Sequence, residues 1–158
     1  MTDVYTIRTG RESKVGSIGG ELKVAKTTIP AASLRTLAAT HYEVAPAPGP
    51  GRTLIFQGGF MALDYGSITF DDAAGDGNLT LYYTDGSGVA VSEEAEADAL
   101  IDATTDTMLT LEPIDNGAYV PAVNAPFVLG NTADEFTGST ADSNLQVTIW
   151  YLDVPTGL

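Results

Sequence analysis

The sequence predicts a mainly β protein: a single β-sandwich of jelly-roll-like arrangement, with one or two short helices and an extended N-terminal arm. Short segments of alternating apolar and polar residues recur from residue 53 onward, and Gly, Asp and Pro turns separate them. The chain has 158 residues, which is enough for one domain with a core of its own and short for two. We therefore expect an arm over residues 1–28 and a β-sandwich domain over residues 29–158.

The longest regular alternation lies at residues 144–154, and a strand of this length is expected in the middle of a sheet. The apolar residues on one face of this strand are Leu145, Val147, Ile149 and Tyr151. The pair Gly58–Gly59 interrupts another apolar stretch and predicts a bend or bulge between two strands. The remaining expected strands are residues 53–57, 60–65, 78–83, 89–91, 107–111 and, less regularly, 125–129.

A first short helix is expected over residues 29–38. Pro30 suits its first turn, and Leu34 and Leu37 fall on one face. The segment 45–51 that follows contains three prolines and two glycines, which exclude both a helix and a central strand. We expect it to be a connection.

A second helix is expected from Ser92, as the N-cap residue, to about Asp102. Acidic residues follow Ser92 directly, where the helix dipole favours negative charge. The expected apolar stripe of this helix consists of Ala97, Leu100 and Ile101.

The charges divide the chain into two unequal parts. Residues 1–52 hold all seven Lys and Arg against four acids, a sum of +3, whereas residues 53–158 hold seventeen Asp and Glu and no basic residue, a sum of −17. The total is the net charge of −14. An acidic body repels nucleic-acid phosphates, so no nucleic-acid partner is expected.

The residues that usually carry catalysis are scarce. The chain has no Cys, and its single histidine, His41, lies between a predicted helix and the Pro-rich connection, with no Gly-x-Ser-x-Gly motif anywhere. A packing or surface role for His41 is therefore expected, and the protein is not expected to be an enzyme or to need a cofactor. The Asp- and Gly-rich segment from Asp71 to Asn78 offers calcium ligands but lacks the EF-hand spacing, and a plain turn is the alternative that we favour.

No apolar run approaches the ~18 residues of a membrane-spanning helix, and the N-terminus lacks the pattern of a signal peptide. We therefore expect no membrane partner, and a chain that is made in a cytoplasm and is soluble there.

The N-terminal segment is basic relative to the body, with a net charge of +2 over residues 1–28. Such a segment is attracted to acidic surfaces, including the body of a neighbouring copy. The residues expected to bind a partner are Arg8, Arg11, Lys14, Lys23 and Lys26. A solvated tail is the alternative interpretation.

One stretch of the chain resembles a pattern in small structural proteins of tailed bacteriophages. The residues that carry it are Ile29-Pro30-Ala31-Ala32, Leu37-Ala38-Ala39-Thr40, the run from Tyr42 to Arg52, and Leu63-Asp64-Tyr65-Gly66. They cover about a quarter of the chain and contain no catalytic motif, and Arg52 stands where the pattern has Lys.

The resemblance implies a virion component, and the charge distribution favours a capsid decoration (cement) protein on the outside of the head. Such proteins are small, β-rich and commonly trimeric. The expected partners are the major capsid protein and further copies of this chain in a homotrimer, assembled in the host cytoplasm. The alternatives are a tail or fibre-tip adhesin domain that binds a host surface glycan and, more distantly, an enzyme acting on polysaccharide.

Overall fold

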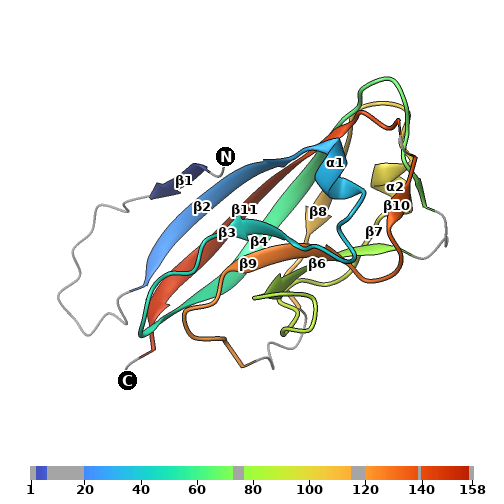
Figure 1. The fold of residues 1–158 in the computed structure, drawn as a ribbon. Helices are drawn as coiled ribbons and strands as arrows, with labels where there is room; N and C mark the ends of the chain where they lie inside the picture. The colour runs from blue at the N-terminus through green and yellow to red at the C-terminus, as the bar shows by residue number, and fades with distance from the viewer. Residues whose placement is uncertain (1–2, 7–19, 73–76, 115–119, 139, 157–158) are drawn as a thin grey trace.

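The computed structural model describes residues 3–6, 20–72, 77–114, 120–138 and 140–156, and within them the chain forms two antiparallel sheets around one core (Figure 1). The larger sheet has the strand order β1-β2-β11-β4-β8, the smaller one has the order β3-β9-β6-β7, and β10 pairs with β5 separately. The elements are β1 (Asp3–Thr6), β2 (Glu21–Ile29), α1 (Ala31–Leu34), β3 (Tyr42–Ala45), β4 (Arg52–Asp64), β5 (Asp71–Asp72), β6 (Asn78–Tyr83), β7 (Ala95–Glu96), α2 (Asp98–Ile101), β8 (Thr107–Leu111), β9 (Phe127–Asn131), β10 (Phe136–Thr137) and β11 (Asn144–Pro155). A mainly β fold with two short helices is as the sequence predicts.

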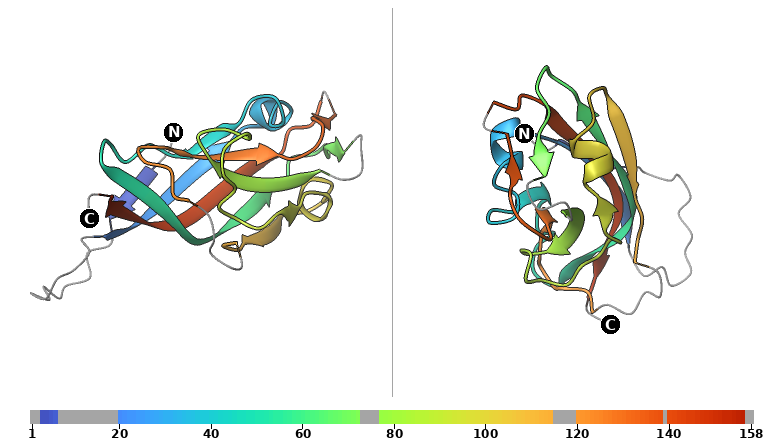
Figure 2. Two further views of the ribbon diagram at one scale, coloured as in Figure 1. Left: turned by 90° about the horizontal axis from the view of Figure 1, so that it is seen from below. Right: turned by 90° about the vertical axis from the view of Figure 1, so that its right-hand side faces the viewer.

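Strand β11 lies in the middle of the five-stranded sheet, between β2 and β4, as its regular alternation predicts. The four residues predicted to share one face are all buried between the two sheets: Leu145, Val147, Ile149 and Tyr151. Because directly opposed residues of an antiparallel ladder point to the same side, β11 sets which side of β2 and β4 faces the core. Figure 2 shows the two sheets lying face to face.

Strand β4 is one strand of thirteen residues, with a bulge at the predicted Gly58–Gly59 pair. Trp150 of β11 is opposite Gly58, while the next residue of β11, Tyr151, is opposite Phe56, so that Gln57 is the extra residue. Gly58 has a φ of +141°, a conformation that residues with a Cβ atom rarely adopt. The bulge therefore keeps both halves of β4 in register with β11.

The structure differs from the predicted arm over the last part of residues 1–28. Residues 21–28 belong to β2, which pairs with β11 from Glu21 to Ile29. The core-facing positions of this strand hold small or apolar residues, with Ala25 and Ile29 fully buried and Thr27 nearly so. Strand β1 pairs with the other edge of β2, and residues 7–19 lie outside the described residues.

The second helix is shorter than predicted. Helix α2 begins at Asp98, and Ser92 is no helix cap: its buried hydroxyl oxygen accepts a hydrogen bond from the backbone N–H of Leu81 at 2.9 Å. The reason is a tertiary contact, because the segment after Ser92 pairs with β6 through β7. The predicted apolar stripe is nevertheless correct, since Leu100 and Ile101 are fully buried.

The first helix and the connection after β3 also follow the sequence prediction in part. Helix α1 follows Pro30, and both Leu34 and Leu37 are fully buried. The Pro-rich segment joins β3 of the smaller sheet to β4 of the larger one. Among the described residues, no helix has the length and apolarity that crossing a membrane requires.

An exposed carboxylate holds the turn that follows β4. Asp142 accepts hydrogen bonds from the backbone N–H groups of Ser67 and Ile68 and from the Ser67 hydroxyl, at 2.7, 2.9 and 2.8 Å. These bonds lower the pKa of Asp142 to about 2. A Cβ atom on Gly66 would lie 2.3 Å from this carboxylate, so the turn requires glycine there.

The position of β11 leads to a test of the core. Ile149 is fully buried and lies opposite Ala25 and Gly59, so Ile149→Asp places an unpaired charge in the core. That costs several kcal/mol against a total stability of about 5–15 kcal/mol. We expect thermal unfolding by circular dichroism to show no cooperative transition for this variant. The matched control is Thr148→Asp, one residue earlier on the outer side, which is expected to unfold cooperatively close to the wild-type temperature.

Candidate interaction face

The outer side of the five-stranded sheet carries a cluster of apolar side chains around Trp150 and Leu152, although it faces away from the core. Alternate residues of β2, β11 and β4 point to this side, and they oppose one another in rows across the sheet. Leu22, Leu152 and Ile55 form one such row. We call this surface the outer sheet face and define it by Leu22, Val24, Ile55, Phe60, Trp150 and Leu152.

Trp150 occupies the centre of the outer sheet face because the bulge makes room for it. It lies opposite Gly58, and a Cβ atom on that glycine would be only 3.0 Å from the indole Nε1. The ring of Phe60 is 6.5 Å from the Trp150 ring, centroid to centroid. The glycine that forms the bulge therefore also allows the indole to lie against the sheet, which is how an aromatic side chain compensates for a strand glycine.

Large exposed apolar side chains concentrate on this side of the molecule. Six such side chains are exposed among the described residues, and three of them hold ladder or bridge positions on or beside this face: Met108, Val123 and Trp150, at 62%, 55% and 37% exposure. No other described strand or helix lies over the five-stranded sheet on this side (Figure 2). Of the six residues that define the outer sheet face, Trp150 is exposed and the other five are half-buried, and an apolar cluster of this kind is a candidate interaction site.

A small acidic pocket adjoins the outer sheet face between β4 and β8. Its volume is about 260 Å³, and it is lined by Ala62, Leu63, Asp64, Asp106, Thr107, Met108 and Gln146. Asp106 accepts a hydrogen bond from the backbone N–H of Tyr65 at 3.0 Å, whereas Asp64 has no bonding partner within the described parts of the chain. The pocket thus combines carboxylates with apolar walls, which suits the ammonium group and the aliphatic stem of a basic side chain.

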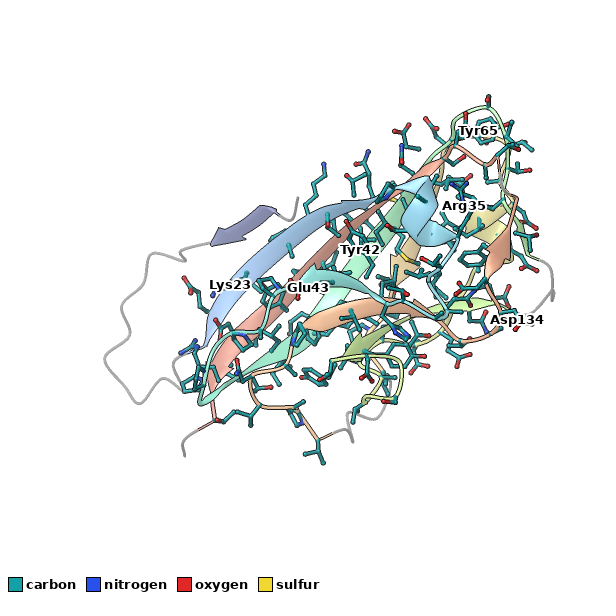
Figure 3. All side chains as sticks on the ribbon, in the orientation of Figure 1. Lys23, Arg35, Tyr42, Glu43, Tyr65 and Asp134 are labelled. Carbon is teal, nitrogen blue, oxygen red and sulfur yellow. The ribbon has the colours of Figure 1, made fainter. Side chains whose placement is uncertain are left out.

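The opposite side of the sandwich is acidic. Glu43 of β3 and Glu96 of β7 lie on the outer side of the smaller sheet, and Figure 3 shows Glu43 on that sheet. Glu94 and Asp85 lie nearby and are exposed. The two outer surfaces of the sandwich therefore differ in chemistry, one apolar with few charges and the other rich in carboxylates.

The structure separates the basic residues that the sequence predicts to act together. Arg8, Arg11 and Lys14 lie outside the described residues. Lys26 is exposed on the outer sheet side, opposite Thr148, whereas Lys23 points to the inner side, opposite Tyr151 (Figure 3). Lys23 is thus a structural residue rather than part of an exposed basic surface.

Lys23 belongs to an ion cluster that closes one end of the sandwich. Its Nζ atom lies 2.7 Å from one carboxylate oxygen of Asp153, and the Nε atom of Arg52 lies 2.7 Å from the other. Asp153 is buried, with 2% of its surface exposed. Because the three residues come from β2, β11 and β4, the cluster ties three neighbouring strands together.

The structure describes part of the residues that the sequence offers for catalysis or metal binding. His41 packs against Gly86 and Gly130, and its ring makes an edge contact with Tyr82 at 6.2 Å, which is a packing role. Within the described residues no group of three or more His, Cys, Asp or Glu is placed to hold a metal ion. The Asp71–Asn78 segment considered for calcium falls largely outside the described residues.

The sequence alone does not predict the outer sheet face, because the predicted apolar face of β11 is the one that carries Leu145, Val147, Ile149 and Tyr151. The signal is present in the intervening positions, where Trp150, Leu152 and Val154 are also apolar. A strand that is apolar on both faces predicts burial on both sides. In this fold the second side remains exposed in the single chain.

No protein-family model matches the chain, and no curated protein matches it either. A chain of the solved structure "Cyanophage Pam1 capsid asymmetric unit" is similar to it, with a TM-score of 0.47 and 20% sequence identity. The similarity spans 91% of this chain and 94% of that chain. At this level it carries no argument about the fold or the function.

The ion cluster gives a stability prediction. Asp153→Asn leaves Lys23 and Arg52 partly buried without their counter-charge, and breaking a buried pair costs about 3–5 kcal/mol. Since both cations keep some solvent contact, we expect a loss of about 2–3 kcal/mol in the free energy of unfolding by urea. The control is Asp64→Asn, an exposed carboxylate without a partner in the described chain, where a change below about 0.5 kcal/mol is expected. Equal effects of the two changes would contradict the structural role of Asp153.

Tyr151 gives a pH prediction for the same end of the sandwich. Burial, together with the negative charges of Asp153 and Glu21, raises the pKa of Tyr151 to about 12. Between pH 10 and 12 the unfolded chain therefore loses this phenolic proton while the folded chain keeps it, and stability falls as the pH rises. We expect Tyr151→Phe to lose less stability than the wild type between pH 9.5 and about 11.5, measured by urea unfolding. Parallel losses in the two proteins would show that Tyr151 ionises normally when folded.

Proposed function

We propose that this protein is a structural component of a bacteriophage virion: a decoration (cement) protein bound to the outside of the head. The single observation that carries the proposal is the contrast between the two outer surfaces, one apolar and the other acidic. A protein with this contrast covers the apolar surface in an assembly and turns the acidic surface to water. The resemblance of residues 29–66 to small phage structural proteins supports the same role.

The strand pairing supports a jelly-roll topology for this component. Counting only β2, β3, β4, β6, β7, β8, β9 and β11 gives eight strands. The first pairs with the eighth, the second with the seventh, the third with the sixth and the fourth with the fifth. This nested pairing is what results when one long antiparallel hairpin is rolled into two sheets, and the jelly roll is common among viral capsid proteins.

The proposed role is mechanical rather than enzymatic. The protein would bind the major capsid protein across capsomer boundaries as a homotrimer. Because the three copies are linked, several weak contacts together give a much higher overall affinity than one contact alone. Attachment is assigned to the basic N-terminal residues Arg8, Arg11 and Lys14. Lys23 is removed from this set because Asp153 already neutralises it.

Co-sedimentation with expanded, undecorated phage heads tests this function. We expect saturable binding at a fixed number of copies per head, weakening as salt rises because exposed charges are screened. Arg8, Arg11 and Lys14 changed together to Gln should weaken binding and flatten its salt dependence. A matched triple change of exposed acids on the far surface, Glu43, Glu94 and Glu96 to Gln, should leave binding unchanged.

Two results would contradict the proposal. Absence of binding to heads at low salt would exclude decoration, and binding to isolated host envelope would then favour the adhesin alternative. Binding with the same salt dependence in the Arg8, Arg11 and Lys14 variant would assign attachment to another surface.

A further inference from the structure

The outer sheet face and its margins carry two groups of opposite charge. On the β2 side, Lys26 is exposed, and its ladder partner on β1 is Asp3. On the β8 side, the pocket presents the carboxylates of Asp64 and Asp106. Apolar side chains, with Trp150 at their centre, lie on the strands between the two.

Lys26 is too far from Asp64 and Asp106 of its own chain to form an ion pair with them. Strands β11 and β4 separate them, and at ~4.8 Å between neighbouring strands the distance across the sheet is roughly 12 Å. An ion pair requires the nitrogen and oxygen atoms to be within about 4 Å. Lys26 can therefore enter such a pocket only on another copy of the chain.

Few basic residues of this chain are available to pair with the carboxylates of the pocket. There is no Lys or Arg after Arg52. Among the described residues, Lys23 and Arg52 are bound to Asp153, and Arg35 donates hydrogen bonds to the carbonyl oxygens of Gly138 and Ala141. Of the lysines and arginines in the described parts of the chain, this leaves Lys26 as the exposed cation on the outer side of the five-stranded sheet.

We propose that the outer sheet face is the interface between copies of this chain, and that Lys26 of one copy enters the Asp64–Asp106 pocket of the next. The lysine stem would pass over Met108 and Ala62, while the ammonium group pairs with the two carboxylates. The apolar centre around Trp150 supplies most of the burial. This inference needs only self-association and does not depend on a role in a virion.

The whole outer side of the five-stranded sheet, of which the outer sheet face is a part, is close in size to such an interface. Four strands spaced by ~4.8 Å, over the ~34 Å length of about ten residues of β11, span on the order of 600 Å² before side-chain relief is counted, with polar positions such as Thr148 and Gln146 included. A specific interface buries about 800 Å² on each partner. The exposed acids Glu43 and Glu96 lie on the opposite sheet, away from the contact.

Sedimentation equilibrium of the full chain tests the interface. We expect self-association of the wild type, and at least tenfold weaker association for Lys26→Glu, since close interfacial charge pairs are worth more than ~1.4 kcal/mol. The double change Asp64→Lys and Asp106→Lys should weaken association equally. Combining all three changes should restore it, because the charges are then exchanged between the two sides. The control is Glu43→Lys on the acidic surface, which should not weaken association.

A second measurement reports on the face itself and is independent of the charge changes. Trp150 is the only tryptophan, so its fluorescence emission should move to longer wavelength as dilution separates the copies and exposes the indole. Wild-type protein that is monomeric at ~100 μM, where a micromolar complex is formed, would overturn the proposal. So would association that Lys26→Glu leaves unchanged or that the charge exchange fails to restore. Binding to phage heads is a separate readout, so failure here is distinguishable from failure of the proposed function.

Discussion

The fold depends on the pairing of β11 with both β2 and β4. β11 pairs over nine residues with β2 and over twelve with β4, and it joins segments that lie at least eighty residues apart in the chain. The register of such a ladder is strongly specified, because a slip of one residue would move Ile149 to the outside and Trp150 into the core. The alternation of β11 therefore decides at once what is core and what is surface on its two neighbours.

The bulge in β4 is the local adjustment that makes this long pairing compatible with both faces. On the inner side it keeps Phe56 opposite Tyr151 and Gly59 opposite Ile149. On the outer side its glycine leaves space for Trp150 to lie against the strand. One backbone feature thus serves the packing of the core and the shape of the outer sheet face together.

The sequence predicts the elements that carry a regular pattern and misses those whose pattern depends on distant partners. The strands at residues 78–83 and 107–111 have the predicted bounds, because their alternation and flanking turns are local. The sequence groups residues 21–28 with the arm because Gly16, Gly19 and Gly20 interrupt any regular element there and because polar and basic residues are frequent. The charge of Lys23 is paired with Asp153, 130 residues further along the chain, and nothing in the local sequence shows this.

The interaction face was only partly predictable for a related reason. A strand that is apolar on both sides was visible in the sequence, but not that its neighbours place Leu22, Val24 and Ile55 beside it. Nor could the sequence show that the basic residues separate, with Lys23 turned inward and Lys26 outward. The two point to opposite sides because they are three positions apart on a strand, an odd number in a pattern of period two.

The charge distribution explains how a chain of net charge −14 can nevertheless associate. Packed sheets are separated by ~10 Å, and the Debye length at physiological salt is about 8 Å, so carboxylates on the smaller sheet are largely screened from a contact made through the larger one. Attraction through apolar burial acts only at contact, while the acids repel approach from the other side. Contact between copies through the larger sheet is therefore permitted, whereas the acids on the smaller sheet disfavour further stacking on that side. The expected assembly is limited in size and has an acidic exterior.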